Sequence, residues 1–355
     1  MAEVIGLGVS HWPRLPMGED GYAIRLRNSL RDPHIPAEVK DPANWPEAMR
    51  REWGDDQGMS QTAAHREGLL RGLRRVRAKL DAFNPDVVVI WGDDQYENFR
   101  EDIVPPFCVY AYREDMVVKP FKAGNIWGMA PEAEVRIKAA PEIGHALATG
   151  LIEQDFDLAY SYKPLHYPGL SHAFLNAVLY LNHDQADKTS FPWPVLPFEV
   201  NCYGSHVLSH RGTVPQLHDE SIRLDPPGPS PRRCFELGRA TARYFKASPY
   251  RAALVASSSW SHAFLVPKHW QLYPDVPADR RLYNALVAGD WKAWIDTPLA
   301  TLVDCGQQEV LNWFCLAGAM CELNARLEWS EFVESWIFNS NKVAAVFDAA
   351  GTGTN

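Results

Sequence analysis

The amino-acid sequence predicts an α/β fold, an αβα sandwich in which helices cover both faces of a mostly parallel sheet. Short apolar runs that suit buried strands alternate with longer segments whose apolar residues recur at helical spacing. The series begins with a strand over 4–9, a helix over 61–82 and a strand over 87–91. This order predicts a pair of parallel strands joined by a right-handed crossover.

The remaining elements follow from the same two periodicities. We expect further strands over 107–111, 156–160, 194–200 and 252–256. We expect further helices over 141–154, 169–181 and 232–247. Residues 12–60 lack clear periodicity and predict a long excursion that covers part of the site, and the proline-rich residues 205–231 predict a loop. From residue 279 the pattern is helical almost to the end, and a flexible Gly/Thr tail follows at 351–355.

Composition narrows the class of protein. The chain has 355 residues and a net charge of −9, which argues against nucleic-acid binding. Its one dense basic cluster, Arg71 to Lys79, is interpreted as a solvated helix face. No apolar stretch is long enough to span a membrane, and the six cysteines show no paired spacing. We therefore expect a soluble cytoplasmic protein with reduced thiols.

Polar side chains follow several of the predicted strands directly. The first strand ends at His11, the second ends in a Gly-Asp-Asp-Gln motif that closes at Gln95, and a later strand leads through a serine-rich turn to His262. In open α/β sheets, ligands bind beside the carboxyl ends of the strands. These residues therefore mark the predicted site, and the predicted protein is an enzyme.

Three further residues are candidates with more than one interpretation. Glu309 lies near the start of an apolar helix, where it either faces a metal ion or interacts with the helix dipole. His65 lies in the first turns of the helix over 61–82, at the same edge as His11, as a ligand or as an exposed or capping residue. His172 either moves a proton near neutral pH or is held by a backbone carbonyl.

An ordered series of motifs carries a family resemblance. It comprises Ser10 to Pro13, Pro85 to Phe99, Pro231 to Gly238, Trp260 to His262 and Gly306 to Trp313. With these motifs the chain resembles the class III extradiol ring-cleaving dioxygenases, the superfamily of the catalytic β subunit of protocatechuate 4,5-dioxygenase. The resemblance runs through most of the chain and is poorest over 14–60 and 203–228. It implies one catalytic domain over 1–350, with 14–60 as an insertion and 279–350 as a helical part.

In that family a non-haem Fe(II) is held by two histidines and a glutamate, and O₂ is the co-substrate. The resemblance places His11 and Glu309 among the metal ligands. By the same resemblance, His262 corresponds to the active-site histidine that contacts a substrate hydroxyl.

The chain departs from the best-known members at two positions. They have Asp-His where this chain has Asp94-Gln95, and His-Gly where it has Pro168-Gly169. This chain is similar to a branch of the family that has the same Gly-Asp-Asp-Gln motif. That resemblance implies that His172 takes the acid/base position. The third metal ligand is then either Gln95, through its amide oxygen, or His65, and both remain open.

The leading hypothesis is therefore oxygen-dependent meta cleavage of a catecholic ring. Trp12, Tyr96 and Trp260 line the ring pocket or belong to the core. Two other functions remain open, a metal-poor binding module and a zinc- or manganese-dependent hydrolase on the same fold. We expect a small aromatic substrate, a homo-oligomer and no separate small subunit.

Overall fold

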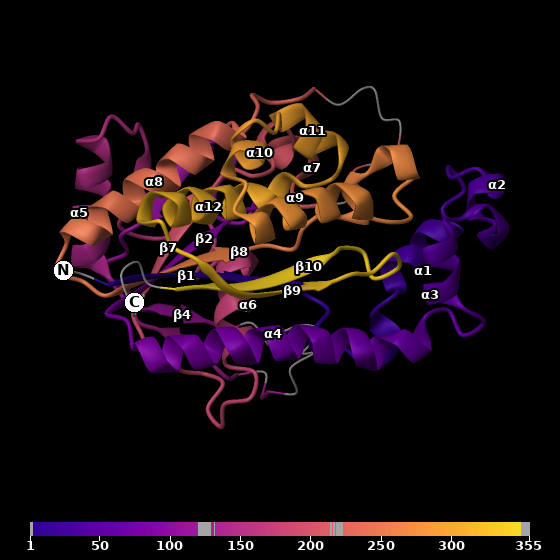
Figure 1. The fold of residues 1–355 in the computed structure, drawn as a ribbon, viewed down its shortest axis with the longest axis horizontal. Coiled ribbons are helices and arrows are strands. Elements are labelled where there is room, and N and C mark those ends of the chain that lie inside the picture. The colour runs from indigo at the N-terminus through magenta and orange to yellow at the C-terminus, as the bar shows by residue number, and fades with distance from the viewer. Residues whose placement is uncertain are drawn as a thin grey trace.

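The structure, a computed structural model, describes residues 3–119, 129–130, 132–213, 215, 217 and 223–348 (Figure 1). The strands are β1 (Val4–Val9), β2 (Val87–Gly92), β3 (Phe107–Tyr110), β4 (Met116–Val118), β5 (Val135–Ile137), β6 (Ala159–Ser161), β7 (Val195–Val200), β8 (Ala252–Ser257), β9 (Leu327–Val333) and β10 (Lys342–Phe347). The helices are α1 (Ile24–Arg31), α2 (Ala37–Lys40), α3 (Glu47–Trp53), α4 (Thr62–Phe83), α5 (Pro141–Ile152), α6 (His172–Leu181), α7 (Val207–His210), α8 (Pro231–Ala247), α9 (Val276–Ala288), α10 (Trp291–Ile295), α11 (Leu299–Asp304) and α12 (Leu311–Leu323).

The main sheet has eight strands in the order β6-β3-β7-β2-β8-β1-β10-β9. Its four central strands, β7, β2, β8 and β1, are parallel to their neighbours within this group. Their residues are almost all buried and apolar, as expected for strands covered on both faces. The carboxyl ends of these four strands therefore meet at one edge, and the prediction of a mostly parallel sheet is confirmed.

The two strands of the predicted pair are parallel, as expected, but they are not neighbours in the sheet. β1 and β2 run parallel, but β8 lies between them, because Leu254 is the register partner of Gly6 on one side and of Val89 on the other. Strand β8 comes from the last third of the chain, so local periodicity could not show that it would enter here.

Helices cover both faces of the sheet (Figure 1). On one face α12 packs against β1, β8 and α8, and on the other α4 and α6 pack against the sheet. Gly8 shows how closely α12 approaches, because a Cβ built there would lie 2.1 Å from the Trp313 ring. A side chain at Gly8 would therefore displace the helix that follows Glu309.

The prediction of a helical C-terminal region is correct only as far as α12. Residues 327–333 and 342–347 form β9 and β10, and β10 pairs antiparallel with β1. Leu327 to Val333 alternates between apolar and polar residues for most of its length, which is typical of a strand. The pairing brings Lys342 and the segment before it to the carboxyl end of β1.

The other predicted elements differ less from those in the structure. The strand expected over 156–160 is β6 at Ala159–Ser161, and the segment expected to be a loop over 205–231 contains the short helix α7. The predicted tail over 351–355 lies outside the described residues. The six cysteines all carry free thiols. Across the described part of the chain, each helix is too short or too polar to span a membrane.

Candidate functional site

Side chains from the ends of the central strands converge on Glu309. His11 follows β1, Asp93 follows β2, and their ligand atoms and that of Glu309 all lie within 4.8 Å of one another. All three residues are buried, and each is at most 2% exposed. Among the described residues this is the group whose spacing suits a metal ion.

The hydrogen bonds of His11 define which ring nitrogen faces the site. Ser257 Oγ donates to the carbonyl of Ala173 at 2.7 Å, so it accepts from His11 Nδ1 at 3.1 Å. The proton on Nδ1 leaves a lone pair on Nε2, which faces Glu309 Oε2 at 3.4 Å. Burial lowers the pKa of His11 well below its usual value, so the ring is neutral. A hydrogen-bonded serine that fixes the tautomer in this way is typical of a metal-binding histidine.

The loop before Glu309 sets its position. Glu309 lies in a 3₁₀ turn, Gln308–Val310, which leads directly into α12. Gly306 has a φ of +67° and its carbonyl accepts a hydrogen bond from the backbone of His262 at 2.9 Å. Because a Cβ at Gly306 would lie 2.8 Å from the carbonyl oxygen of His262, glycine allows the two loops to meet.

The electrostatics at Glu309 favour a cation. Burial, and then the nearby Asp93 carboxyl, raise the pKa of Glu309 well above its usual value. Burial raises the pKa of Asp93 to about 6. Glu309 Oε2 is buried without a hydrogen-bond partner in the described structure. Two neighbouring buried carboxyls and an unpaired oxygen are costly in isolation, and a bound divalent ion would compensate all of them.

Gln95 reaches the centre of this cluster through its amide nitrogen. The nitrogen lies 2.9 Å from Tyr203 Oη, 3.2 Å from Glu309 Oε1 and 3.3 Å from Asp93 Oδ2. The amide has two N–H groups, so it can donate to two of these oxygens at a time, and in this arrangement the nitrogen rather than the oxygen of Gln95 faces the carboxyls. The neighbouring Asp94 points elsewhere and accepts from the backbone of residues 97–99, which shapes the turn after β2.

His262 and His172 flank the cluster with opposite protonation states. His262 Nε2 lies 3.6 Å from Glu309 Oε1, and burial, reinforced by the charge of Lys342, lowers the pKa of His262 to about 3. His172 Nδ1 lies 3.0 Å from Glu97 Oε2. Burial alone would lower the pKa of His172, but the Glu97 charge outweighs it and raises the pKa to about 10. At neutral pH His262 is therefore neutral, whereas the Glu97 carboxylate favours the protonated form of His172.

A buried carboxylate on α9 joins the loops that carry the site. Asp279 accepts hydrogen bonds from the backbone of Ser261, from Gln307 Nε2 at 2.7 Å and from Asn341 Nδ2 at 2.6 Å. Ser261 precedes His262, and Gln307 lies two residues before Glu309. Asp279 therefore holds the segments of both site residues against the segment that leads into β10.

The structure places His65 apart from the cluster. It lies in the first turn of α4, as predicted, and its ring contacts those of Trp12, Tyr22 and Phe338. It is not part of the group of ligand atoms around Glu309 found among the described residues. Asp93 is the third member of the group of ligand atoms described around Glu309, and the choice between Gln95 and His65 as a metal ligand stays a prediction.

The three candidate pocket aromatics have other surroundings. Trp12 is buried against Tyr22 and His65, and Lys342 Nζ lies 3.9 Å from its ring centre. Trp260 packs among aromatic residues of the core, Tyr283, Trp294, Trp313 and Phe332. The hydroxyl of Tyr96 donates to an exposed glutamate, Glu101. Their described contacts are those of packing or surface residues.

Sequence reasoning missed three residues of the site. Asp93 lies in the same motif as Gln95, so its position at the strand end was a usable signal. Glu97 follows two residues after Gln95 and could have been paired with a histidine only with knowledge of the fold. Tyr203 follows β7, but no motif marks it.

The fold and the site together define an α/β protein with a buried imidazole–carboxylate cluster at the carboxyl edge of its parallel strands. No family model matches the chain. Curated relatives with significant similarity are named 2,3-dihydroxyphenylpropionate/2,3-dihydroxicinnamic acid 1,2-dioxygenases. One from Pseudomonas putida is 28% identical over 196 residues, which is 55% of this chain and 49% of the relative.

Two further relatives carry the same name. The one from Comamonas testosteroni is 24% identical over 197 residues, covering 56% of this chain and 49% of the relative. The one from Burkholderia vietnamiensis is 27% identical over 198 residues, covering 56% and 50%. The chain spans about half the length of the curated relatives it matches. Over that part it is similar to dioxygenases that act on catechols.

Proposed function

We propose that this protein is an extradiol dioxygenase that uses Fe(II) and O₂ to open a catecholic ring. The observation that carries the proposal is the cluster of His11, Asp93 and Glu309, with an unpaired carboxylate oxygen facing a histidine lone pair. The names of the relatives support the substrate class, because each describes a dioxygenase of a 2,3-dihydroxyphenyl compound.

The residues present fit a divalent iron. One imidazole and two carboxylates are donors that Fe(II) accepts, and Asp93 here takes the place of a second histidine. When bound, the ion would supply Lewis-acid activation of the catechol and of O₂. Gln95 would help to hold Glu309 in place through its amide nitrogen, and the His65 ring would pack against Trp12.

The two flanking histidines have different roles toward protons of the substrate. Neutral His262 can accept a hydrogen bond from a substrate hydroxyl, and the protonated form of His172 can donate a proton to a developing oxyanion. Environments that push two pKa values apart in this way are typical of an acid–base pair. Glu97 keeps His172 protonated and oriented through the contact at Nδ1.

The remaining properties are part of the same proposal. The substrate is a catechol with a short acidic side chain, as in the names of the relatives. The catalytic domain covers residues 1–350 as a single αβα sandwich. The protein acts in the cytoplasm as a homo-oligomer without a small partner subunit.

The test begins with protein purified without oxygen and loaded with Fe(II). Replacement of Glu309 by Ala should lower iron affinity and catechol-dependent oxygen uptake by more than about a hundredfold, because removal of a ligand exceeds the effect of removing its hydrogen-bond partners. Glu47→Ala changes a glutamate that is 78% exposed and serves as the control. Retention of iron or of oxygen uptake by the Glu309 variant would contradict the proposal.

The same assay separates the two other functions. A binding module would take up no stoichiometric metal and would bind a catechol without consuming oxygen. A hydrolase would bind zinc or manganese and turn over an ester or amide without consuming oxygen. The dioxygenase alone should couple oxygen uptake to a yellow ring-opened product.

A further inference from the structure

The two carboxylate oxygens of Glu309 have different surroundings. Oε1 lies 2.7 Å from Tyr203 Oη and 3.2 Å from Gln95 Nε2. Oε2 faces His11 and is buried without a hydrogen bond from any described residue. One oxygen is thus surrounded by donors, and the other is directed at the remaining members of the cluster.

Tyr203 is the stronger of the two donors to Oε1. It follows β7, is only 7% exposed, and its hydroxyl accepts from Gln95 at 2.9 Å while it contacts Glu309. A carboxylate that binds a metal is ionised, so it can only accept, and the tyrosine must donate. With Tyr203 and Gln95 both donating, the two lone pairs of Oε1 are occupied.

We infer that Tyr203 is a positioning residue that makes Glu309 a monodentate ligand, through Oε2 alone. This inference rests on the proposed metal site. A carboxylate that binds through both oxygens occupies one more coordination position than a monodentate one. By holding Oε1 away, Tyr203 keeps that position open for a molecule that exchanges with solvent or substrate.

The test uses Mn²⁺ as the probe, because bound water can be counted on it from the relaxation of water protons. In Tyr203→Phe the ring remains and the hydroxyl is lost, which frees Oε1. The variant should still bind Mn²⁺. Its water-proton relaxation rate should fall by the contribution of one metal-bound water molecule, because the freed oxygen takes that molecule's place. Tyr110→Phe is the matched control, since it removes a buried hydroxyl that has no hydrogen-bond partner among the described residues. Relaxation unchanged from wild type in metal-loaded Tyr203→Phe would overturn the inference.

A second variant, at the other donor to Oε1, tests whether the effect is specific to Tyr203. Gln95→Met removes the longer contact to Oε1 and leaves the tyrosine donor, so it should keep more bound water than Tyr203→Phe. An equal loss in both variants would overturn the special role of Tyr203. If the wild-type protein binds no Mn²⁺ at this site, both the metal site and the inference fail. If wild type binds it and only the relaxation prediction fails, the proposed function stands without the inference.

Discussion

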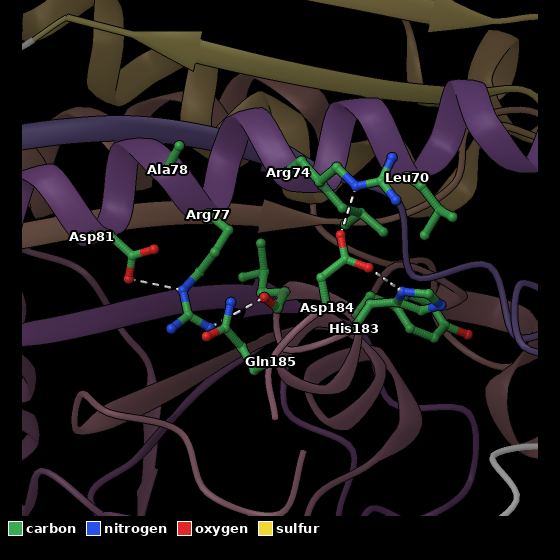
Figure 2. Close-up of a pocket in the computed structure, with 11 residues that line it drawn as sticks. Leu70, Arg74, Arg77, Ala78, Asp81, His183, Asp184 and Gln185 are labelled. Carbon is green, nitrogen blue, oxygen red and sulfur yellow. Dashed lines mark hydrogen bonds and ion pairs between the residues drawn. The ribbon is translucent and has the colours of Figure 1, made fainter. Parts of the chain in front are cut away.

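Two regions rich in charged side chains differ in how those charges are compensated. Along α4, Arg74 lies 2.8 Å from Glu67. Arg74 also lies 2.6 Å from Asp184, and Arg77 donates to Asp81 (Figure 2). Arg74, Arg77, Asp81 and Asp184 line a pocket, and each of these charged groups is paired with one of opposite charge. At the strand ends, Asp93 and Glu309 are buried beside each other without a described arginine or lysine partner, and both pKa values are raised.

The comparison contrasts exposed charges that are paired with buried carboxyls that have no described arginine or lysine partner. The Arg74 side chain is 48% exposed, where water and salt weaken its ion pairs, and such pairs contribute little to stability. Glu309 is 1% exposed, where an uncompensated charge is expensive. Proteins keep such groups where a ligand compensates them, so the pattern of pairing identifies the site better than the density of charge or the presence of a pocket.

The largest effect should come from the carboxylate that joins the site loops. Asp279→Ala would leave donors on Ser261, Gln307 and Asn341 unpaired in a buried setting, so the free energy of unfolding should fall by about 3–5 kcal/mol. Urea unfolding measures this. Asp279→Asn keeps one acceptor oxygen and should lose less. A loss below about 1 kcal/mol for alanine would show that the site loops do not depend on this carboxylate.

The pH dependence of stability should reveal the Glu97–His172 pair. The folded-state pKa of about 10 exceeds the unfolded value near 6.5, so the stability that His172 contributes is complete below pH 6.5 and is lost as pH rises toward 10. Glu97→Gln should flatten this decline by up to about 1.4 kcal/mol per pH unit. Urea unfolding of both proteins at pH 6 and pH 9 makes the comparison. Parallel curves would mean that Glu97 does not hold the proton on His172.

The smallest effect should come from the charged face of α4. Arg74→Ala removes two exposed ion pairs, and the free energy of unfolding should change by less than about 1 kcal/mol. Added salt should reduce even this difference, because exposed charges are screened. A change above about 2 kcal/mol would remove the contrast between the two regions.

Much of the fold could be predicted because periodicity reports local burial. Apolar runs located the central strands, and helical spacing located α4 and α8 to within a residue or two. The C-terminal strands were missed because β10 is stabilised by pairing with β1, whose residues lie more than 300 positions away. The insertion of β8 between β1 and β2 was missed for the same reason.

The sequence by itself predicted the edge of the sheet at which the candidate residues gather, because parallel strands end on the same side and His11, Gln95 and His262 come after such strands. It also singled out Glu309, since a carboxylate at the start of an apolar helix calls for a compensating partner. The tertiary structure alone decided the set of neighbours: Asp93 in the cluster rather than His65, the nitrogen of Gln95 facing the carboxylates, and Tyr203 on one oxygen of Glu309. Those choices depend on distances of a few ångströms between residues far apart in the chain, and periodicity carries no information about them.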